Sequence, residues 1–552
     1  MTSKKTPILI ILALTAITAL LYFNSLGNGF VFDDELLIKD QGYILKDIRN
    51  VFSSATALVF QDKTSAAFYR PIMVLSYFID YHVGAGSAMT FHASNLALHL
   101  INVLLVFFAA LFIFKDIFPA FLASLFFSVH PVQAEAIAWI SGRNDPLMMG
   151  FVLLSFISFA RYRENGNRIM LGASGLFFFL SLFTKESAFI FPLIFLGYDL
   201  FFVVKGSKRP VKLELIGAYV LFAILLFVYA GIRLFSIKGG GGQLGGITSM
   251  PLIYFFYFKN LVIPAGFSVV PFIKTQLGAA EYLMRSLPLF ILIGLIFLAR
   301  KKMPIVSFGL WWGLLALLPV SGIISMPILA MEHRLYGAMF GFSLVFASIS
   351  EHVLKRYGKY RSGIILVLVV ILGLFGWMTF QRSRLFSSPL VLWETSVRNN
   401  SSSDLIYTNL AAAEINLHNY PLAEQQLKKA LEIRASNEIA HYNLGYLYLL
   451  TGKKEAGKKE FEKAIELDPK YIKAHYNLGI IALNARDNKT AIRQMELILT
   501  MRPGYILAYN TMGDAYYNLG EDNKAGSSYE QVLKLDPTNA HAKEMLTKLN
   551  LE

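Results

Sequence analysis

A series of long apolar runs limits this chain to very few folds. Stretches of about 17 to 25 mostly apolar residues recur through the first two thirds of the sequence, and each is long enough to cross the hydrocarbon core of a bilayer. Hydrophobic residues make up 55% of the 552 residues and charged residues only 16%, whereas soluble domains carry about 25% charged residues. We therefore expect a polytopic membrane protein that is all-α in this part.

The apolar runs predict about eleven spans. Their approximate bounds are 7–23, 91–114, 117–140, 146–160, 169–183, 187–204, 213–234, 286–299, 304–319, 335–349 and 363–380. Residues 250–285 are broken by three prolines and Gly266, so we expect a re-entrant or interfacial segment there. Lys4 and Lys5 precede the first run without a clean cleavage site after it, which predicts an uncleaved span whose start is cytoplasmic.

Basic residues recur in alternate short loops, namely 161–168, 205–212, 300–302 and 355–361. The positive-inside rule places these loops in the cytoplasm. The same topology puts the loop 24–90 outside, together with the polar residues at the ends of several other spans. It also explains the formal net charge of +14 without nucleic acid as a partner.

The chain changes character from Asp404 onward, where a repeat of about 34 residues begins. Tyr442-Asn443-Leu444-Gly445 recurs at Tyr476-Asn477-Leu478-Gly479, and Leu467-Asp468-Pro469 recurs at Leu535-Asp536-Pro537. This pattern is typical of tetratricopeptide repeats, which stack into an α-solenoid with a peptide-binding groove. We expect a membrane domain at 1–384, a linker at 385–403 and a repeat domain at 404–552.

Three consecutive carboxylates, Asp33, Asp34 and Glu35, follow the first span directly. Burying a charge in hydrocarbon is costly, so they are expected at the membrane edge, facing water or a cavity. Asp33 is the preferred general base for an acceptor hydroxyl, with the choice between it and Asp34 open, and a divalent metal is an alternative use of the pair. The simpler alternative is a solvated cap of the first helix.

A second group of polar residues lies between two predicted spans, from His130 to Asp145. Glu135 and Trp139 are four residues apart and share a helical face. Arg143 is placed where a lipid phosphate would arrive, and guanidinium binds phosphate bidentately. An interfacial Trp–Arg anchor is an equally good interpretation.

Two shorter motifs, Lys185-Glu186 and Glu332-His333-Arg334, end or begin predicted spans on the same side. Arg334 is a candidate phosphate ligand and His333 a supporting donor, whereas Lys185 and Glu186 on their own would form a plain interfacial pair. His92, Asn95 and His99 share one helical face and are expected to make interhelical hydrogen bonds.

Several chemistries have no motif in this sequence. Cysteine is absent, so disulfides and cysteine metal sites are excluded. Neither a His-Glu-x-x-His zinc motif nor a P-loop occurs, and we predict no metal site and no certain cofactor.

The order of the polar motifs resembles that of membrane glycosyltransferases of the GT-C class. The first motif is the acidic pair in Phe30-Val31-Phe32-Asp33-Asp34. The later strings are Phe68-Tyr69-Arg70-Pro71, His130-Pro131 with Glu135, Trp139 and Gly142-Arg143, then Lys185-Glu186, Glu332-His333-Arg334 and the C-terminal repeats. Together they are similar to the transmembrane and tetratricopeptide-repeat-containing (TMTC-type) protein O-mannosyltransferases and their bacterial relatives.

The resemblance implies transfer of mannose or another hexose from a polyprenyl-phosphate donor to a protein Ser/Thr hydroxyl, with inversion, on the extracytoplasmic face of the inner membrane. It implies Asp33 and Asp34 as catalytic carboxylates, and Arg143, Lys185 and Arg334 as ligands of the donor phosphate. It also implies that the repeat groove holds the acceptor polypeptide. The supporting polar residues would be Glu35, Arg70, His130, Glu135, Asp145, Glu186, Glu332 and His333.

Two other functions remain open at this stage. One is an oligosaccharide ligase or polymerase that uses lipid-diphosphate donors. The other, from a different class, is a membrane-anchored repeat scaffold for envelope complexes, although an anchor needs one span rather than about eleven.

Overall fold

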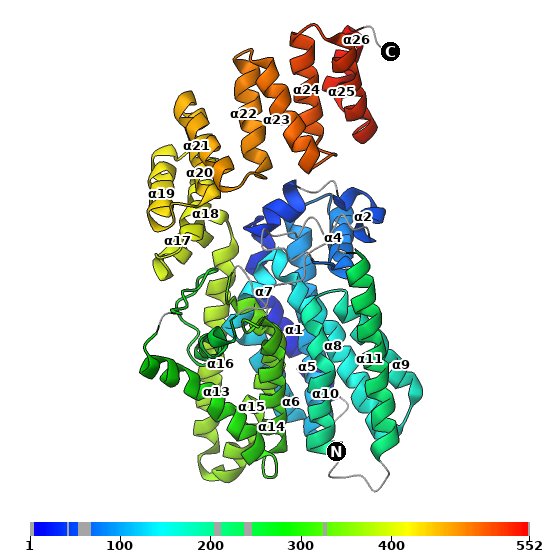
Figure 1. Cartoon of the computed structure of the whole chain (residues 1–552). Coiled ribbons are helices and arrows are strands. Elements are labelled where there is room, and N and C mark those ends of the chain that lie inside the picture. The colour runs from blue at the N-terminus through cyan, green and yellow to red at the C-terminus, as the bar shows by residue number, and fades with distance from the viewer. Residues whose placement is uncertain are drawn as a thin grey trace. The chain divides into compact units, whose positions relative to one another are not determined.

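The computed structural model describes residues 5–40, 44–52, 68–203, 211–236, 246–275, 277–323 and 328–549. Within these ranges the chain is helical and contains no strand. It divides into two compact units, Met1–Asn400 and Ser401–Glu552 (Figure 1). The predicted all-α class, a membrane helix bundle followed by a tetratricopeptide-repeat solenoid, is confirmed.

The first unit is a bundle of long helices with several shorter ones between them (Figure 1). Its helices are α1 (Lys5–Tyr22), α2 (Ile48–Phe52), α4 (Pro71–Val83), α5 (Ala88–Phe114), α6 (Ile117–Val129), α7 (Ala134–Ala138), α8 (Asn144–Asn165), α9 (Arg168–Leu182), α10 (Phe191–Tyr198), α11 (Val211–Ser236), α12 (Met250–Val262), α13 (Ala279–Ala299), α14 (Pro304–Leu317), α15 (Tyr336–Arg356), α16 (Arg361–Ser383) and α17 (Pro389–Asn399).

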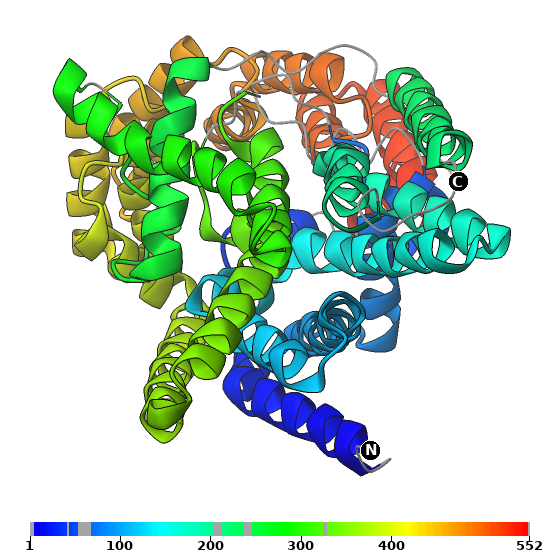
Figure 2. The ribbon, with the colours of Figure 1, turned by 90° about the horizontal axis from the view of Figure 1, so that it is seen from below.

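Seven helices in the described residues are long and apolar enough to cross a membrane, and a bent pair makes an eighth candidate. The bent pair is Ile117–Val129 with Pro131–Ala138, and the bend is 53°. Every predicted span contains a helix, but those at 169–183 and 304–319 are short. The predicted count of about eleven is therefore not confirmed, whereas a multi-pass membrane protein is. One such helix, α1, lies at the periphery of the unit (Figure 2).

Small residues allow the bundle to pack closely. Gly309 on α14 and Gly341 on α15 face each other so tightly that an added Cβ on Gly309 would lie 2.5 Å from the carbonyl oxygen of Gly341. Close backbone approach at glycines is a common device between membrane helices, where dispersion rather than water exclusion holds helices together. Trp312 is packed in the same region against Phe156 and Phe340.

The segment 250–285 is a 13-residue helix, α12, followed by irregular backbone. The next helix, α13, begins at Ala279, seven residues before the predicted start of its span. The loop predicted at 24–90 contains α2, α4 and shorter turns, which share a small apolar core with residues of α5 and η5 (Ile140–Arg143). The buried members of that core are Ile38, Leu45, Val51, Met73, Val74, Tyr77, Phe91 and Ile140.

The predicted linker at 385–403 is mostly folded. A short turn, η12 (Arg384–Phe386), leads into α17, whose first turn is capped by the Ser388 hydroxyl. Leu392 and Trp393 on α17 are buried within the first unit, and the boundary between the two compact units follows Asn400, inside the predicted linker. The reason is the apolar face of α17, which packs rather than staying solvated.

The second unit is a series of antiparallel helix pairs. They are α18 (Asp404–Asn416) with α19 (Tyr420–Ile433), α20 (Glu438–Leu450) with α21 (Lys454–Leu467), α22 (Ile472–Asn484) with α23 (Asn488–Met501) and α24 (Ile506–Asn518) with α25 (Asp522–Leu535), followed by α26 (Ala540–Lys548). A Cβ on Gly513 would lie 2.6 Å from the Tyr529 ring, so the repeated glycine is required where the two helices of a pair touch.

Candidate functional site

The acidic motif is a tight turn whose second carboxylate points into the protein. Asp34 is 0% exposed, and one of its oxygens accepts hydrogen bonds from the Ser141 backbone N–H at 2.8 Å and from the Ser141 hydroxyl at 2.5 Å. Its other oxygen accepts a bond from the Val31 N–H at 3.2 Å. Asp34 therefore ties the motif to η5 (Ile140–Arg143).

Asp33 and Glu35 flank this buried carboxylate and are half-buried. The residue before them, Phe32, has a left-handed φ of 53°, which is strained for a bulky side chain and occurs preferentially at functional sites. Its ring stacks on Trp139 at 5.6 Å and meets Trp393 edge-on at 5.2 Å. These ring contacts of Phe32, together with the hydrogen bonds of Asp34, hold in place the turn that carries Asp33.

Burial raises the pKa of Asp34 to about 7, although the hydrogen bonds from Ser141 and Val31 oppose the shift. The folded protein therefore holds this proton more tightly than the unfolded chain, whose carboxyl ionises near 3.8. As pH rises from about 4 to about 7, the free energy of unfolding should fall by on the order of 4 kcal/mol from this group alone.

That sign is testable against Asp34→Asn, which cannot titrate. The thermal midpoint of each protein is measured in detergent from pH 5.5 to 8. As pH rises over this range, the midpoint of the native chain should fall relative to that of the variant, and the difference between them should become constant near pH 8. A difference between the two that does not change with pH would contradict the protonated, buried Asp34.

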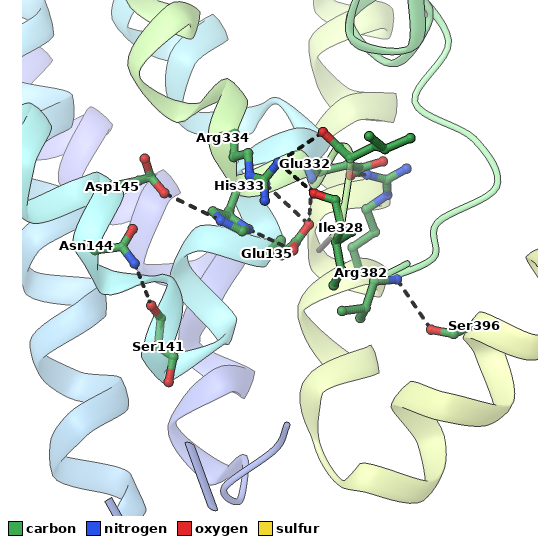
Figure 3. Close-up of polar contacts among 12 residues, drawn as sticks. Glu135, Ser141, Asn144, Asp145, Ile328, Glu332, His333, Arg334, Arg382 and Ser396 are labelled. Carbon is green, nitrogen blue, oxygen red and sulfur yellow. Dashed lines mark hydrogen bonds and ion pairs between the residues drawn. The ribbon is translucent and has the colours of Figure 1, made fainter. Parts of the chain in front are cut away.

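A second cluster joins two motifs that are far apart in sequence, residues 130–145 and 332–334 (Figure 3). The Glu135 carboxylate on α7 accepts hydrogen bonds from the backbone N–H groups of Glu332 and His333 at 3.0 and 3.3 Å, and lies 2.9 Å from His333 Nδ1. The other ring nitrogen of His333 is 3.8 Å from Asp145. The Glu135 carboxylate therefore accepts the hydrogen bonds of the first backbone N–H groups of η10 (Glu332–Leu335) and holds its start in place.

Lys185 closes the other side of the cluster, since its ammonium group donates to both oxygens of Asp145 at 2.7 Å. The next residue, Glu186, forms a bidentate pair with Arg70, at 3.0 and 2.6 Å. The predicted residues Arg70, Asp145, Lys185 and Glu186 thus form two neighbouring ion pairs. Lys185 is buried and neutralises Asp145 in this arrangement.

Aromatic contacts link the cluster to the acidic turn. The Trp139 ring, which stacks on Phe32, also meets the His333 ring at 5.4 Å. The backbone N–H of Trp139 donates to the Glu135 carbonyl, and its own carbonyl accepts from Asn95. Trp139 therefore lies between the turn that carries Asp33 and the turn that carries Arg334.

Arg334 differs from the other basic residues of the site. It is half-buried, and its Nη1 donates to the backbone carbonyls of Ile328 and Leu329 at 3.1 Å (Figure 3). Within the described ranges, no carboxylate lies within ion-pair distance of it. Arg334 is thus a cation held by neutral oxygens, which leaves its charge for an incoming anion.

Arg143, also predicted to bind phosphate, is 0% exposed. It pairs with Asp80 at 2.5 Å, donates to Asn95 at 2.6 Å and donates to the Phe91 carbonyl at 2.7 Å. Its guanidinium has no surface to offer a lipid phosphate in this structure. Arg143 joins η5 to α4 and α5, so in this structure it stabilises the packing of the helices beside the site.

His130 is likewise part of the support. It lies at the break between α6 and η4 (Pro131–Gln133), where its Nδ1 accepts the Val132 N–H, and its Nε2 is 3.1 Å from the Leu261 carbonyl. On the polar face of α5, His99 makes the expected interhelical contact, with the Tyr336 hydroxyl on α15, whereas His92 contacts the carbonyl of Gly29, which lies in a non-helical segment.

Sequence reasoning missed Arg382, near the end of α16. It forms a buried ion pair with Glu332, and both residues are labelled in Figure 3. Its guanidinium also donates to the Pro264 carbonyl at 2.8 Å. The only sequence signal for Arg382 is its position just after the last apolar run, where a cation is ordinarily an interfacial anchor. As for metals, the described residues contain no group of three His, Asp or Glu side chains arranged as ligands.

Fold and site together define a multi-pass membrane protein with a polar, ion-paired centre built from several helix ends, followed by a tetratricopeptide-repeat unit. Residues 439–471, 460–493 and 506–539 match tetratricopeptide repeat families. The crystal structure of MamA aligns to this chain with a TM-score of 0.25 and 21% identity, covering 31% of this chain and 92% of that one.

The chain is similar in sequence to protein O-mannosyl-transferases, which confirms the predicted resemblance. Protein O-mannosyl-transferase Tmtc2 of Drosophila melanogaster is 29% identical over 229 residues, covering 40% of this chain and 24% of that protein. Human protein O-mannosyl-transferase TMTC3 is 24% identical over 499 residues, covering 79% of this chain and 52% of that protein. The chain thus spans about a quarter and about half of the length of these two relatives.

Proposed function

We propose that this protein transfers a hexose, in the first instance mannose, from a polyprenyl-phosphate donor to a Ser or Thr hydroxyl of an acceptor polypeptide. One observation carries the proposal: the contacts Phe32–Trp139–His333 link the half-buried acidic turn to the turn of Arg334, an arginine without a carboxylate partner among the described residues. A base and a phosphate-binding cation are the two groups that an inverting transfer from a lipid phosphate requires. The names of the sequence relatives, protein O-mannosyl-transferases, support the transfer of mannose to protein.

In this mechanism Asp33 accepts the proton of the acceptor hydroxyl as its oxygen attacks the anomeric carbon of the donor. The bond from that carbon to the phosphate oxygen breaks, and the electron pair leaves with the lipid phosphate. Arg334 stabilises the charge that grows on this leaving group, which is worth most in a site shielded from water. The configuration at the anomeric carbon inverts because attack and departure occur on opposite faces.

Asp34 has a different role from Asp33 in this proposal. Its carboxylate is buried and bonded to Ser141 and Val31, so it fixes the turn from which Asp33 acts. Glu135 and His333 do the same for Arg334 from the other side. Lys185 and Asp145 contribute a neutral pair at the border of the site.

Helix lengths support an extracytoplasmic location. α8 starts next to the site and carries Arg161 and Arg163 at its far end, about 30 Å away at 1.5 Å per residue. α15 likewise starts beside Arg334 and ends at Lys355 and Arg356. If those basic ends are cytoplasmic by the positive-inside rule, the site lies at the other face of the inner membrane, and so does the repeat unit.

The repeat unit is proposed to present the acceptor. Tetratricopeptide arrays bind extended peptide segments in their concave groove, and an extended Ser/Thr-containing segment is the substrate form that a base at a membrane surface can reach. This assignment rests on the repeats alone, so the test below includes an acceptor protein.

The test is a transfer assay with the purified full-length protein in lipid nanodiscs. Polyprenyl-phosphate mannose with a Ser/Thr-rich acceptor protein should yield O-linked mannose, detected by mass spectrometry, while a lipid-diphosphate oligosaccharide should yield none. Transfer only from the diphosphate donor would contradict the proposal in favour of a ligase. No transfer from either donor, with native partners retained by the repeat unit, would favour a scaffold.

A further inference from the structure

One short segment touches both halves of the proposed site. We call residues 382–393 the strap: it comprises the last two residues of α16, η12 and the start of α17. Sequence analysis assigned most of it to a linker, but Arg382, Ser383, Phe386 and Trp393 are buried.

The first end of the strap holds the turn that carries Arg334. The Arg382 guanidinium pairs with the Glu332 carboxylate and donates to the Pro264 carbonyl at 2.8 Å. Both partners of the ion pair are almost fully buried, so the contact is not loosened by solvent. The Glu332 backbone N–H in turn donates to Glu135, and these bonds fix where η10 starts, two residues before Arg334.

The rest of the strap holds the segment that leads into the acidic turn. The Ser383 hydroxyl donates to Asn24 at 2.9 Å, and its carbonyl accepts from the Asn28 side chain at 3.2 Å. The Ser387 carbonyl accepts the Gly29 N–H at 3.2 Å. Trp393 meets the Phe32 ring at 5.2 Å, directly before Asp33.

We propose that the strap sets the spacing between the base and the phosphate-binding cation, with Arg382 and Trp393 as positioning residues for Arg334 and Asp33 respectively. The proposal rests on the proposed function for the roles of those two groups. The physical basis is that a transfer centre needs its reacting groups held to a fraction of an ångström, and a displacement of about 1 Å can cost about a hundredfold in rate. A continuous segment bonded to both turns provides that constraint.

The two ends of the strap should therefore give different kinetic effects. Arg382→Lys keeps the charge but loses the planar fork that binds Glu332 and the carbonyl together. It should raise KM for the lipid-phosphate donor by about tenfold and change kcat little. Trp393→Phe keeps an aromatic ring, but the smaller ring no longer reaches Phe32. This variant should lower kcat by about tenfold and leave the donor KM little changed.

One matched control lies on the strap and a second lies just before it, on α16. Arg384→Gln removes an exposed cation two residues from Arg382, and Trp377→Leu removes a tryptophan that is 60% exposed on α16. Both should leave kcat and KM unchanged. A merely structural role for the strap would lower the thermal midpoint and the active fraction, and leave KM of the remaining enzyme as in the native chain.

The distance between two spin labels, one near each turn, tests the positioning role of the strap without an enzyme assay. Because the chain has no cysteine, nitroxide labels attach only at Lys39→Cys, after the acidic turn, and at Ile328→Cys, before η10. The label-to-label distance distribution should be broadened by Arg382→Lys and Trp393→Phe, and not by Arg384→Gln. Unchanged distributions in both strap variants would overturn the proposal, as would equal effects on KM from both. If the native protein transfers no sugar, the proposed function fails, and the distances still decide the strap.

Discussion

Replacing Asp33 with asparagine is expected to lower kcat for sugar transfer by about a hundredfold to ten-thousandfold, which is the usual contribution of a general base. The amide cannot take the proton from the acceptor hydroxyl, while its shape and the turn around it are kept. Donor KM should change little, because Asp33 does not contact the donor phosphate in the proposed mechanism. The measurement is initial-rate kinetics with polyprenyl-phosphate mannose in nanodiscs.

Two variants control this experiment. Glu394→Gln removes an exposed carboxylate on α17 and should transfer sugar at the native rate. Asp34→Asn should lower the thermal midpoint, since the Val31 N–H then faces an amide donor or loses its partner, and should retain more activity than Asp33→Asn. If Asp34→Asn is inactive at native stability while Asp33→Asn is active, Asp34 is the base and the assignment of roles is wrong.

Replacing Arg143 with alanine is expected to destabilise the first unit by about 3 to 5 kcal/mol, the cost of breaking a buried ion pair. The variant leaves the Asp80 carboxylate buried without its cation and removes the bonds to Asn95 and the Phe91 carbonyl. The expected readout is a markedly lower thermal midpoint and poor recovery of monodisperse protein in detergent.

The control is Arg161→Ala, which removes an exposed cation at the far end of α8 and should change stability by less than about 0.5 kcal/mol. Adding Asp80→Leu to Arg143→Ala should recover part of the lost stability, because the stranded charge is removed. An Arg143→Ala protein with native stability and a raised donor KM would instead make Arg143 a phosphate ligand, as its sequence position suggested.

The sequence predicted the architecture well because its signals are local. Apolar run length determines where helices lie, and the 34-residue period of the repeats depends on glycine and alanine positions that the structure explains by close helix contacts. The number of spans was less predictable, since helices such as α9 and α14 are shorter than a bilayer needs. Their packing in the bundle, rather than their own hydropathy, accounts for them.

The site was predictable as a set of residues but not as a set of roles. Glu135, His333, Asp145 and Lys185, which the predicted topology groups on one side, contact one another in the structure. Arg143 resembles a phosphate ligand in sequence, yet its environment is decided by Asp80, a carboxylate from a different part of the chain. Arg382 resembles an interfacial anchor, yet Glu332 determines its position. Pairing between distant segments has no local sequence signal.

The central claim is that Asp33 and Arg334 lie at the same, non-cytoplasmic end of the membrane bundle. Single cysteines in this cysteine-free chain test it most directly with a membrane-impermeant maleimide on intact spheroplasts. Ser87→Cys and Ser387→Cys, both exposed near the site end, should label without permeabilisation, whereas Asn167→Cys and Lys302→Cys should label only after it. Labelling of Ser87→Cys and Ser387→Cys from opposite sides, or of Asn167→Cys from outside, would contradict the account.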